Sequence, residues 1–257
     1  MSKNPRGRKH KSGISRGRSD ESRPPKARFS REVGVLYEDD AVIILNKPPG
    51  LLAVPIKGSS VPSALSIVSA ELKNRREHAL VVHRIDRFAS GILLFAKTRH
   101  DRQILVDEFL AHTPVRQYLA VVRGRLEKQS GTLVHYFRRE GMWQQLSSAK
   151  NRDATRAELH YSVEREFPDA SLVRVELVTG LQNQIRAQFA AIGHPIIGDR
   201  KYRPAEADEG LINRVALHAA HLEFEHPRSR EIVSIDCPPP QDFERLLRAL
   251  AHAKPRQ

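Results

Sequence analysis

An aspartate between two arginines stands in the polar loop His83-Arg84-Ile85-Asp86-Arg87-Phe88-Ala89-Ser90-Gly91. Apolar runs precede and follow this loop, so a strand is predicted on either side, and loops held by rigid strands commonly display functional residues. The cationic neighbours of Asp86 favour its ionised form. An ionised carboxylate in a cleft can act as a nucleophile, a general base or a metal ligand. A salt bridge within the loop is the alternative interpretation.

A second polar stretch, residues 179–186, joins a predicted strand to a predicted helix. The strand ends at a glycine turn, Gln182 or Asn183 opens the helix, and Arg186 falls in its first turn. The helix dipole disfavours a cation at this end, which indicates that an acid holds Arg186 in place. Alternatively, these residues are ordinary surface residues at the start of a helix.

Tyr118 lies in another apolar run that is predicted to be a strand, and Arg116 shares its face because side chains alternate along a strand. A strand tyrosine usually belongs to the core, but its ring could also line a pocket and stack on a nucleobase. Residues 193–199 combine two glycines and a proline with apolar residues, and we interpret them as a structural loop. We expect His194 to form hydrogen bonds in that loop rather than to catalyse a reaction.

Several kinds of site are missing from the sequence. Cys237 is the single cysteine, so an internal disulfide and a cysteine-rich zinc site are excluded. Zinc-protease motifs and phosphate-binding glycine loops are absent. His218 and His221 fall in a predicted strand and should point to opposite faces, which argues against a metal site. No apolar run could span a bilayer. We expect no cofactor, no metal and no membrane, and a reducing, cytoplasmic location.

The basic charge of the chain is concentrated at its N-terminus. The net charge is +13, and residues 1–31 contain eleven Lys and Arg against only Asp20 and Glu21. Residues 1–30 have almost no large apolar side chains, so we expect a disordered tail. Such a tail is suited to a polyanionic partner, because Lys and Arg release counterions from phosphates. An RNA-binding arm is the favoured interpretation, and a merely solubilising tail is the alternative.

The predicted elements favour the α+β class with a largely antiparallel or mixed sheet, because strands outnumber helices and mostly follow one another directly. A hairpin insertion with an exposed Trp143 is expected within 124–153, and Gly193 is expected to cap the third helix. Strands are expected at 33–37, 41–46, 80–82, 91–97, 115–122, 155–166, 171–178, 217–224 and 231–236, and helices at 62–72, 101–111, 184–192 and 243–252.

Taken together and in this order, these stretches resemble the RluA-type family of RNA pseudouridine synthases. The resemblance spans residues 35–240, and its segments are 37–40, 46–50, 83–86, 90–97, 118–122, 179–180, 184–186, 192–199 and 217–219. It implies the pseudouridine synthase fold, in which a bent mixed sheet and flanking helices surround a central RNA-binding cleft. It also implies that residues 31–257 form the catalytic domain. Many relatives carry an S4-type RNA-binding module before that domain, and the basic tail stands in its position here.

The resemblance assigns roles to individual residues. Asp86 matches the catalytic aspartate and Tyr118 the active-site tyrosine. Arg186 matches the basic residue that pairs with the aspartate, and its charge is expected to keep the carboxylate anionic by lowering its pKa. Arg84 matches a residue that helps to displace the target base and occupies its place.

Further residues of the same stretches are expected to bind RNA beside Arg84, namely His83, Arg87 and Gln184. The chain departs from the family pattern at Phe88, where relatives carry small or polar residues. It also departs at 181–183, where relatives show a basic residue, a threonine or similar, and then histidine. Both departures concern the identity of the RNA.

Several alternatives stay open at this level. Large-subunit ribosomal RNA is the expected substrate and transfer RNA the alternative. Asp86 could attack the sugar carbon or abstract a sugar proton. A ribosome-assembly factor that binds RNA on the same fold without catalysis is a second possible function. A carboxylate-dependent hydrolase would need a second acid, for which the sequence offers no clear candidate. We expect a monomer.

Overall fold

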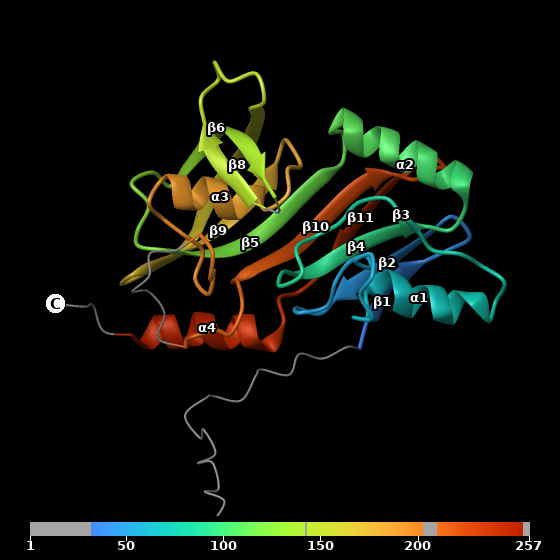
Figure 1. Cartoon of the computed structure of the whole chain (residues 1–257). Helices are drawn as coiled ribbons and strands as arrows, with labels where there is room; N and C mark the ends of the chain where they lie inside the picture. Colours follow the sequence, from blue (N-terminus) through green and yellow to red (C-terminus); the bar gives the residue numbers. More distant parts are fainter. Residues whose placement is uncertain (1–31, 142, 203–209, 254–257) are drawn as a thin grey trace, which may run out of the picture.

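The computed structural model describes residues 32–141, 143–202 and 210–253 (Figure 1). The expected tail, residues 1–30, lies outside the described residues. In the described part the chain forms an eleven-stranded sheet with four helices. The strands are β1 Gly34–Glu38, β2 Val42–Lys47, β3 Leu80–Val81, β4 Ser90–Ala96, β5 Val115–Arg123, β6 Ser130–Glu140, β7 Trp143–Ser147, β8 Thr155–Phe167, β9 Ala170–Leu177, β10 Leu217–Glu225 and β11 Ile232–Asp236, and the helices are α1 Ala64–Lys73, α2 Arg99–Ala111, α3 Gln184–Ala191 and α4 Gln241–His252.

The sheet is mixed, as the sequence predicts, and its one parallel pair joins two antiparallel halves. The strand order is β1-β2-β4-β10-β5-β9-β8-β6-β7. β4 and β10 are parallel only where Ser90 and Gly91 face His218 and Ala219. Beyond this short contact β10 pairs with β11, and β4 pairs with β3. The two halves therefore diverge from the β4–β10 contact.

Gly91 permits the close contact between the two halves. A Cβ at this position would lie 2.1 Å from the carbonyl oxygen of Ala219, and the residue has φ +105°. Both facts require glycine, which has no Cβ and readily adopts positive φ. Gly91, at the end of the Asp86 loop, thus allows β4 to lie against β10 directly beside that loop.

In the first half, helices cover both faces of β2 and β4. Ile43, Leu45, Leu93 and Phe95 pack with α1 on one face. The alternate residues of the same strands pack against α2 on the other face, together with Ile85. Strands buried on both faces read as continuous apolar runs, and every residue of β4 is buried.

Local capping sets the starts of α1 and α2 two residues away from the predicted positions. The Ser63 side chain accepts from the Ser66 amide and the Ser66 side chain accepts from the Ser63 amide, so α1 begins at Ala64 rather than at 62. Thr98 caps α2 by accepting from the Asp101 amide, so this helix begins at Arg99 rather than at 101. The end of α3 has the expected glycine: Gly193, with φ +82°, lies just beyond the last turn of the helix.

The second half is built on β5, β9 and β8, with α3 and α4 on opposite sides of the sheet in Figure 1. Its core includes Phe189 of α3 and Phe243 of α4, both fully buried. The expected insertion within 124–153 is wrong in one respect. β6 and β7 do form a hairpin, but β6 also pairs with β8 along residues 130–137, so it is an integral strand of the sheet.

Candidate active site

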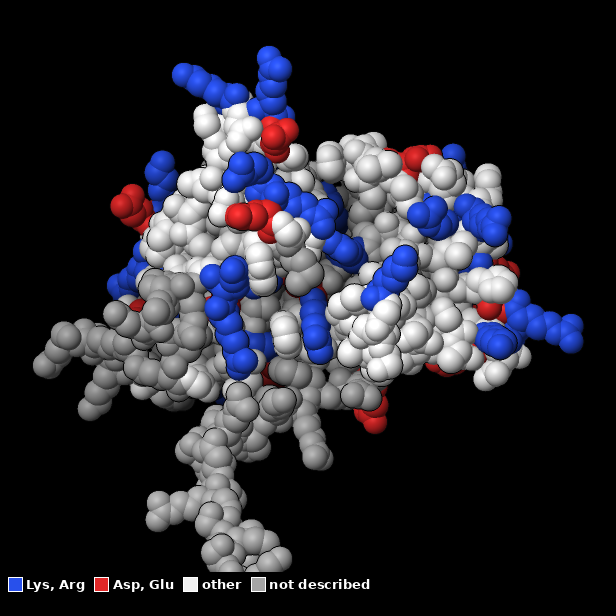
Figure 2. All heavy atoms as spheres, viewed as in Figure 1, with Lys and Arg blue, Asp and Glu red and all other residues white. Residues whose placement is uncertain are grey.

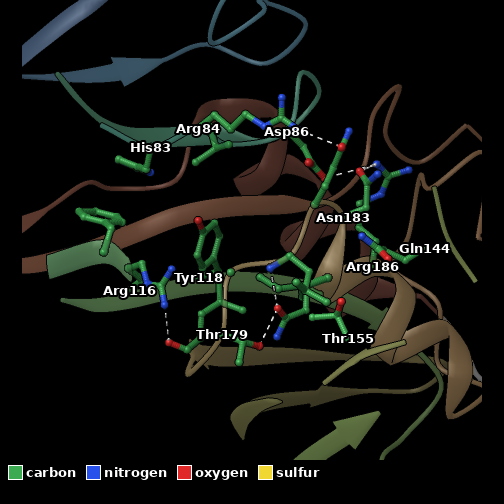
Figure 3. Close-up of a pocket in the computed structure, with 18 of the residues that line it drawn as sticks. His83, Arg84, Asp86, Arg116, Tyr118, Gln144, Thr155, Thr179, Asn183 and Arg186 are labelled. Atoms are coloured by element: carbon green, nitrogen blue, oxygen red, sulfur yellow. Dashed lines mark hydrogen bonds and ion pairs between the residues drawn. The ribbon is translucent and has the colours of Figure 1, made fainter. Parts of the chain in front are cut away.

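A pocket of about 630 Å³ lies in the bend of the sheet, between α2 and the start of α3. Its lining comes from stretches that are far apart in the sequence: the loop 82–86, α2, the start of β5, the β6–β7 hairpin, the start of β8, the turn 177–186 and the start of β10. Asp86, Tyr118 and Arg186 are all among the lining residues (Figure 3). The structure therefore brings together the three side chains that the sequence singles out as catalytic.

Lys47 holds the backbone around Asp86. Its ammonium group donates to the carbonyl oxygens of Pro48, Leu51, Arg87 and Ala89 at 2.7–3.1 Å, and the side chain is fully buried. These bonds join the turn after β2 to the loop that carries Asp86. Burial lowers the pKa of Lys47 to about 7. Lys47 is not among the predicted site residues, although a lysine at the end of an apolar strand is a local signal in the sequence.

Arg186 is fixed by acids, as its position at a helix start predicts. It forms a bidentate pair with Asp199, with Nε at 2.6 Å from Oδ2 and Nη2 at 3.0 Å from Oδ1. Its Nη1 donates to Oδ1 of Asn183 at 2.6 Å and to Oδ2 of Asp86 at 3.3 Å. The contact with Asp86 is the longest, so Asp199 and Asn183 determine where the guanidinium lies.

The loop 193–199, interpreted from sequence as structural, thus supplies a residue of the site. The Asp199 side chain is fully buried and also accepts hydrogen bonds from the amides of Lys201 and Tyr202. Burial raises the pKa of Asp199, but Arg186 and these amides outweigh it, and the net shift is downward. Asp199 is therefore an anion that anchors Arg186. His194, by contrast, bonds to the backbone oxygen of Arg123 in the loop, as expected.

The expected direction of the Asp86 pKa is wrong. Its side chain is only 20% exposed, and burial raises the pKa more than the adjacent Arg186 lowers it. Asp199 adds to the rise through like-charge repulsion, and Lys47 opposes it. A flanking cation is readable in a sequence, whereas loss of hydration depends on the folded pocket. A raised pKa makes Asp86 a stronger base than an exposed aspartate once it is ionised.

Two aromatic rings flank the Arg186 guanidinium. Its Cζ lies 5.4 Å from the ring centre of Tyr202 and 5.9 Å from that of Trp143. The Tyr202 hydroxyl accepts from the amide of Gln144, which ties the β6–β7 hairpin to this loop. The expectation that Trp143 is exposed is therefore wrong: it is half-buried and packs on Arg186 and Tyr202. The sequence carried no local signal for this contact, because it joins distant segments.

Tyr118 projects from β5 into the pocket, between Arg116 and Asp86 as seen in Figure 3. Burial raises the pKa of its phenol to about 12, so the hydroxyl stays protonated near neutral pH. His83 stacks on Phe109 at 4.7 Å between ring centres, and its Nε2 accepts from the Leu94 amide. Burial lowers the pKa of His83 to about 3, so the ring is neutral.

The remaining residues expected to bind RNA differ in their exposure. Arg84 is exposed at the pocket and donates to the side chain of Gln182 at 2.9 Å. Arg87 is exposed, donates to the Gly50 carbonyl and packs on Phe88. Gln184 is buried, and its amide bonds to Thr179, to the Leu181 amide and to the Glu158 carbonyl. Those bonds account for its burial, and its contact with RNA stays a prediction.

The pocket and its surroundings are positively charged. Five arginines and two aspartates line the pocket: Arg84, Arg116, Arg139, Arg156 and Arg186 against Asp86 and Asp153. Figure 2 shows Lys and Arg side chains gathered over the β6–β7 hairpin and along the hollow beside it. In the described part of the chain, no group of three His, Cys, Asp or Glu side chains could hold a metal ion. None of the described helices is long and apolar enough to cross a membrane.

This geometry fits the modification of a nucleotide. A buried carboxylate with an anchored arginine can act on a sugar carbon or proton, an aromatic ring beside it can stack on a base, and the basic walls favour a polyanion. Asp86 and Asp199 both contact Arg186, and a bidentate pair holds Asp199 there. Paired carboxylates of the kind that glycosidases use are therefore not formed by these two residues.

Comparison with known proteins agrees with this geometry. Residues 41–191 match the family model described as RNA pseudouridylate synthase. An uncharacterized RNA pseudouridine synthase of Bacillus subtilis is 34% identical over 224 residues, which cover 85% of this chain and 73% of that protein. The ribosomal large subunit pseudouridine synthase C of Escherichia coli is 32% identical, over 86% of this chain and 70% of its own length.

Solved structures support the same fold. Human RNA pseudouridylate synthase domain containing 4 superposes with a TM-score of 0.70 at 21% identity, over 87% of this chain and 95% of that chain. The chain belongs to the RluA-type family of RNA pseudouridine synthases. It is an isomerase that acts on RNA, and its α+β pseudouridine synthase fold is the one that the sequence predicts.

Proposed function

We propose that Asp86 is the catalytic carboxylate of this enzyme and that it acts on a uridine extruded from a folded RNA. The observation that carries the proposal is the position of Asp86 in the basic pocket, beside an arginine that two other residues hold. The raised pKa of Asp86 and the aromatic ring of Tyr118 in the same pocket support it. Extrusion costs a few kcal/mol, and least at unpaired sites.

The proposed reaction divides the work among three side chains. Arg84, exposed at the pocket, fills the space that the base leaves and stacks through its planar guanidinium. Tyr118 stacks on the extruded uracil. Asp86 breaks the bond between N1 of uracil and the sugar, either by attacking the sugar carbon or by removing a sugar proton. The base then turns and bonds to the sugar through carbon 5. In the first route this bond displaces the Asp86 carboxylate from the sugar carbon, and in the second Asp86 returns the proton to the sugar. Carbon 5 finally loses its proton while N1 gains one.

We further propose that the substrate is large-subunit ribosomal RNA. The support is the name of the Escherichia coli relative, a ribosomal large subunit pseudouridine synthase. Transfer RNA is the alternative, and the exposed Arg87, next to Asp86 in the sequence, is proposed to contact either RNA. We propose that the enzyme works as a monomer and without a cofactor, since each proposed step uses only side chains of this chain. We also propose that it works in the cytoplasm, in keeping with its single cysteine.

Mapping pseudouridine in total RNA from cells with and without the gene tests the substrate. Loss of the modification at a position of large-subunit ribosomal RNA is the expected result. Loss of pseudouridine only in transfer RNA would mean that transfer RNA, and not large-subunit ribosomal RNA, is the substrate. A factor that binds RNA without turnover would leave every position modified, and purified enzyme on transcripts would then separate that function from a redundant enzyme.

A further inference from the structure

Arg116 presents an uncompensated cation at the end of the pocket away from Arg186. The residue is only 8% exposed, and its buried Nε has no hydrogen-bond partner. Its Nη2 reaches the carbonyl oxygens of Leu177 and Val178, both at a long 3.3 Å. No carboxylate in the described part of the chain forms an ion pair with it. A buried charge without an anion is costly, so such residues are commonly kept for a ligand.

The groups around Arg116 are neutral. Tyr118, two residues away on the same strand face, keeps its proton because burial raises its pKa to about 12. His83 is neutral because burial and the Arg116 charge lower its pKa to about 3. Phe109 offers only a ring face, 5.7 Å from the guanidinium carbon. Other arginines of the pocket do have acid partners: Arg186 pairs with Asp199 and Asp86, and Arg156 pairs with Glu158.

The guanidinium of Arg116 lies against the turn after β9. A Cβ at position 180 would lie 2.9 Å from its Nη1, so the glycine after Thr179 lets the guanidinium take this position without shifting. The same glycine turn carries the chain into α3 and Arg186. The turn after β9 therefore positions two arginines, one paired with acids and one that faces the open pocket.

We propose that Arg116 binds a backbone phosphate next to the target uridine, as a phosphate subsite of the pocket. Phosphates are the anions of RNA, and a guanidinium is well suited to their oxygens. If Tyr118 stacks on the uracil, its neighbour on the same face lies two residues along the strand, about 7 Å away, within reach of an adjoining phosphate. This proposal rests on the proposed function and adds to it how the substrate backbone is held.

Nitrogen-15 NMR of the arginine Nε–H groups tests the proposal without turnover. The probes are uridine and uridine 3′,5′-bisphosphate, which carries both phosphates that flank a uridine in RNA. We expect the signal that Arg116→Met removes to shift on addition of the bisphosphate and to stay in place with uridine. Arg248→Gln, in α4 with a 66% exposed side chain, is the matched control and should leave that response unchanged.

A second measurement uses the transcript on which the wild-type enzyme makes pseudouridine. Arg116→Met should weaken binding about tenfold or more and lower the salt slope by about 0.7–0.9, as expected for one lost phosphate contact. Its melting temperature should equal or exceed that of wild type, because an unpaired buried cation is removed. A structural arginine would instead lower the melting temperature, and Arg116→Lys should recover part of the affinity.

Two results would overturn the phosphate subsite. One is an Arg116 signal that ignores the bisphosphate or responds equally to uridine, which would mean a contact with the base. The other is an active enzyme in which Arg116→Met leaves affinity and salt slope unchanged. Neither result bears on whether Asp86 catalyses the reaction. An inactive wild-type enzyme would contradict the proposed function. In that case the nucleotide titration would still show whether Arg116 binds a phosphate.

Discussion

Asp199 should control catalysis without touching the RNA, and Asp199→Asn tests this. The Asp199 carboxylate is fully buried and makes two charge-assisted hydrogen bonds to Arg186, at 2.6 and 3.0 Å. Removing one partner of a buried ion pair costs about 3–5 kcal/mol. Because Arg186 keeps Asn183 and Asp86 as partners, we expect the lower end, a loss of about 3 kcal/mol in the free energy of unfolding by urea.

The same variant should lower kcat by about tenfold or more, because Arg186 is then free to move onto Asp86 and shift it. Release of tritium from carbon 5 of uridine in RNA measures turnover. Asp242→Asn is the matched control, since Asp242 forms an equivalent bidentate pair with the buried Arg214. It should cost stability and leave kcat close to wild type.

The double variant Asp199→Asn with Arg186→Met tests whether the stability lost in Asp199→Asn comes from the unpaired charge of Arg186. Removing the cation as well should recover much of the stability, because the penalty of the single variant comes from an unpaired buried charge. The folded-state pKa of Asp199 is lowered, so its contribution is present above its unfolded pKa of about 4 and is lost as pH falls further. A cost below 1 kcal/mol, or simple additivity in the double variant, would refute the reasoning.

Two further predictions concern the site, and one concerns the basic tail. The acid limb of the kcat/KM profile should lie at a pH above the usual aspartate range, because burial raises the Asp86 pKa. The double variant Arg186→Gln with Asp199→Asn should move this limb to higher pH, because Arg186 lowers the Asp86 pKa more than Asp199 raises it. A limb that stays in place would contradict the role of Arg186. Lys47→Met removes the hydrogen bonds that join the turn after β2 to the Asp86 loop, so kcat should drop more than RNA affinity in filter-binding assays, and an equal loss in both would contradict a positioning role. Deleting residues 1–30, which carry most of the basic excess, should weaken RNA binding and flatten its salt dependence, whereas an unchanged slope would exclude the arm.

The parts of the site that the sequence predicts are those with a local signature. Apolar runs around a polar loop placed Asp86 between two strands, and strand alternation put Arg116 and Tyr118 on one face. The unfavourable position of Arg186 in a first helical turn indicated an acidic partner before any contact was known. Each of these inferences needs only a few consecutive residues.

The parts that the sequence does not predict depend on contacts across the fold. The identity of the acid at Arg186, the clamp formed by Lys47 and the position of Trp143 all join segments that are far apart along the chain. Loss of hydration at Asp86 likewise depends on distant segments that close around it, so its pKa moves opposite to the expectation from its charged neighbours. Sequence patterns indicate faces and turns, whereas dielectric surroundings exist only in the folded protein.

Purified wild-type enzyme and Asp86→Asn, compared on the same transcript, test the central claim most directly. The readouts are pseudouridine by mass spectrometry and RNA affinity by filter binding. We predict that Asp86→Asn makes no pseudouridine, binds RNA nearly as well as wild type and is at least as stable, because the charged form of a buried aspartate with a raised pKa costs stability near neutral pH. Pseudouridine made by Asp86→Asn at a rate near that of wild type would contradict the assignment of the catalytic carboxylate.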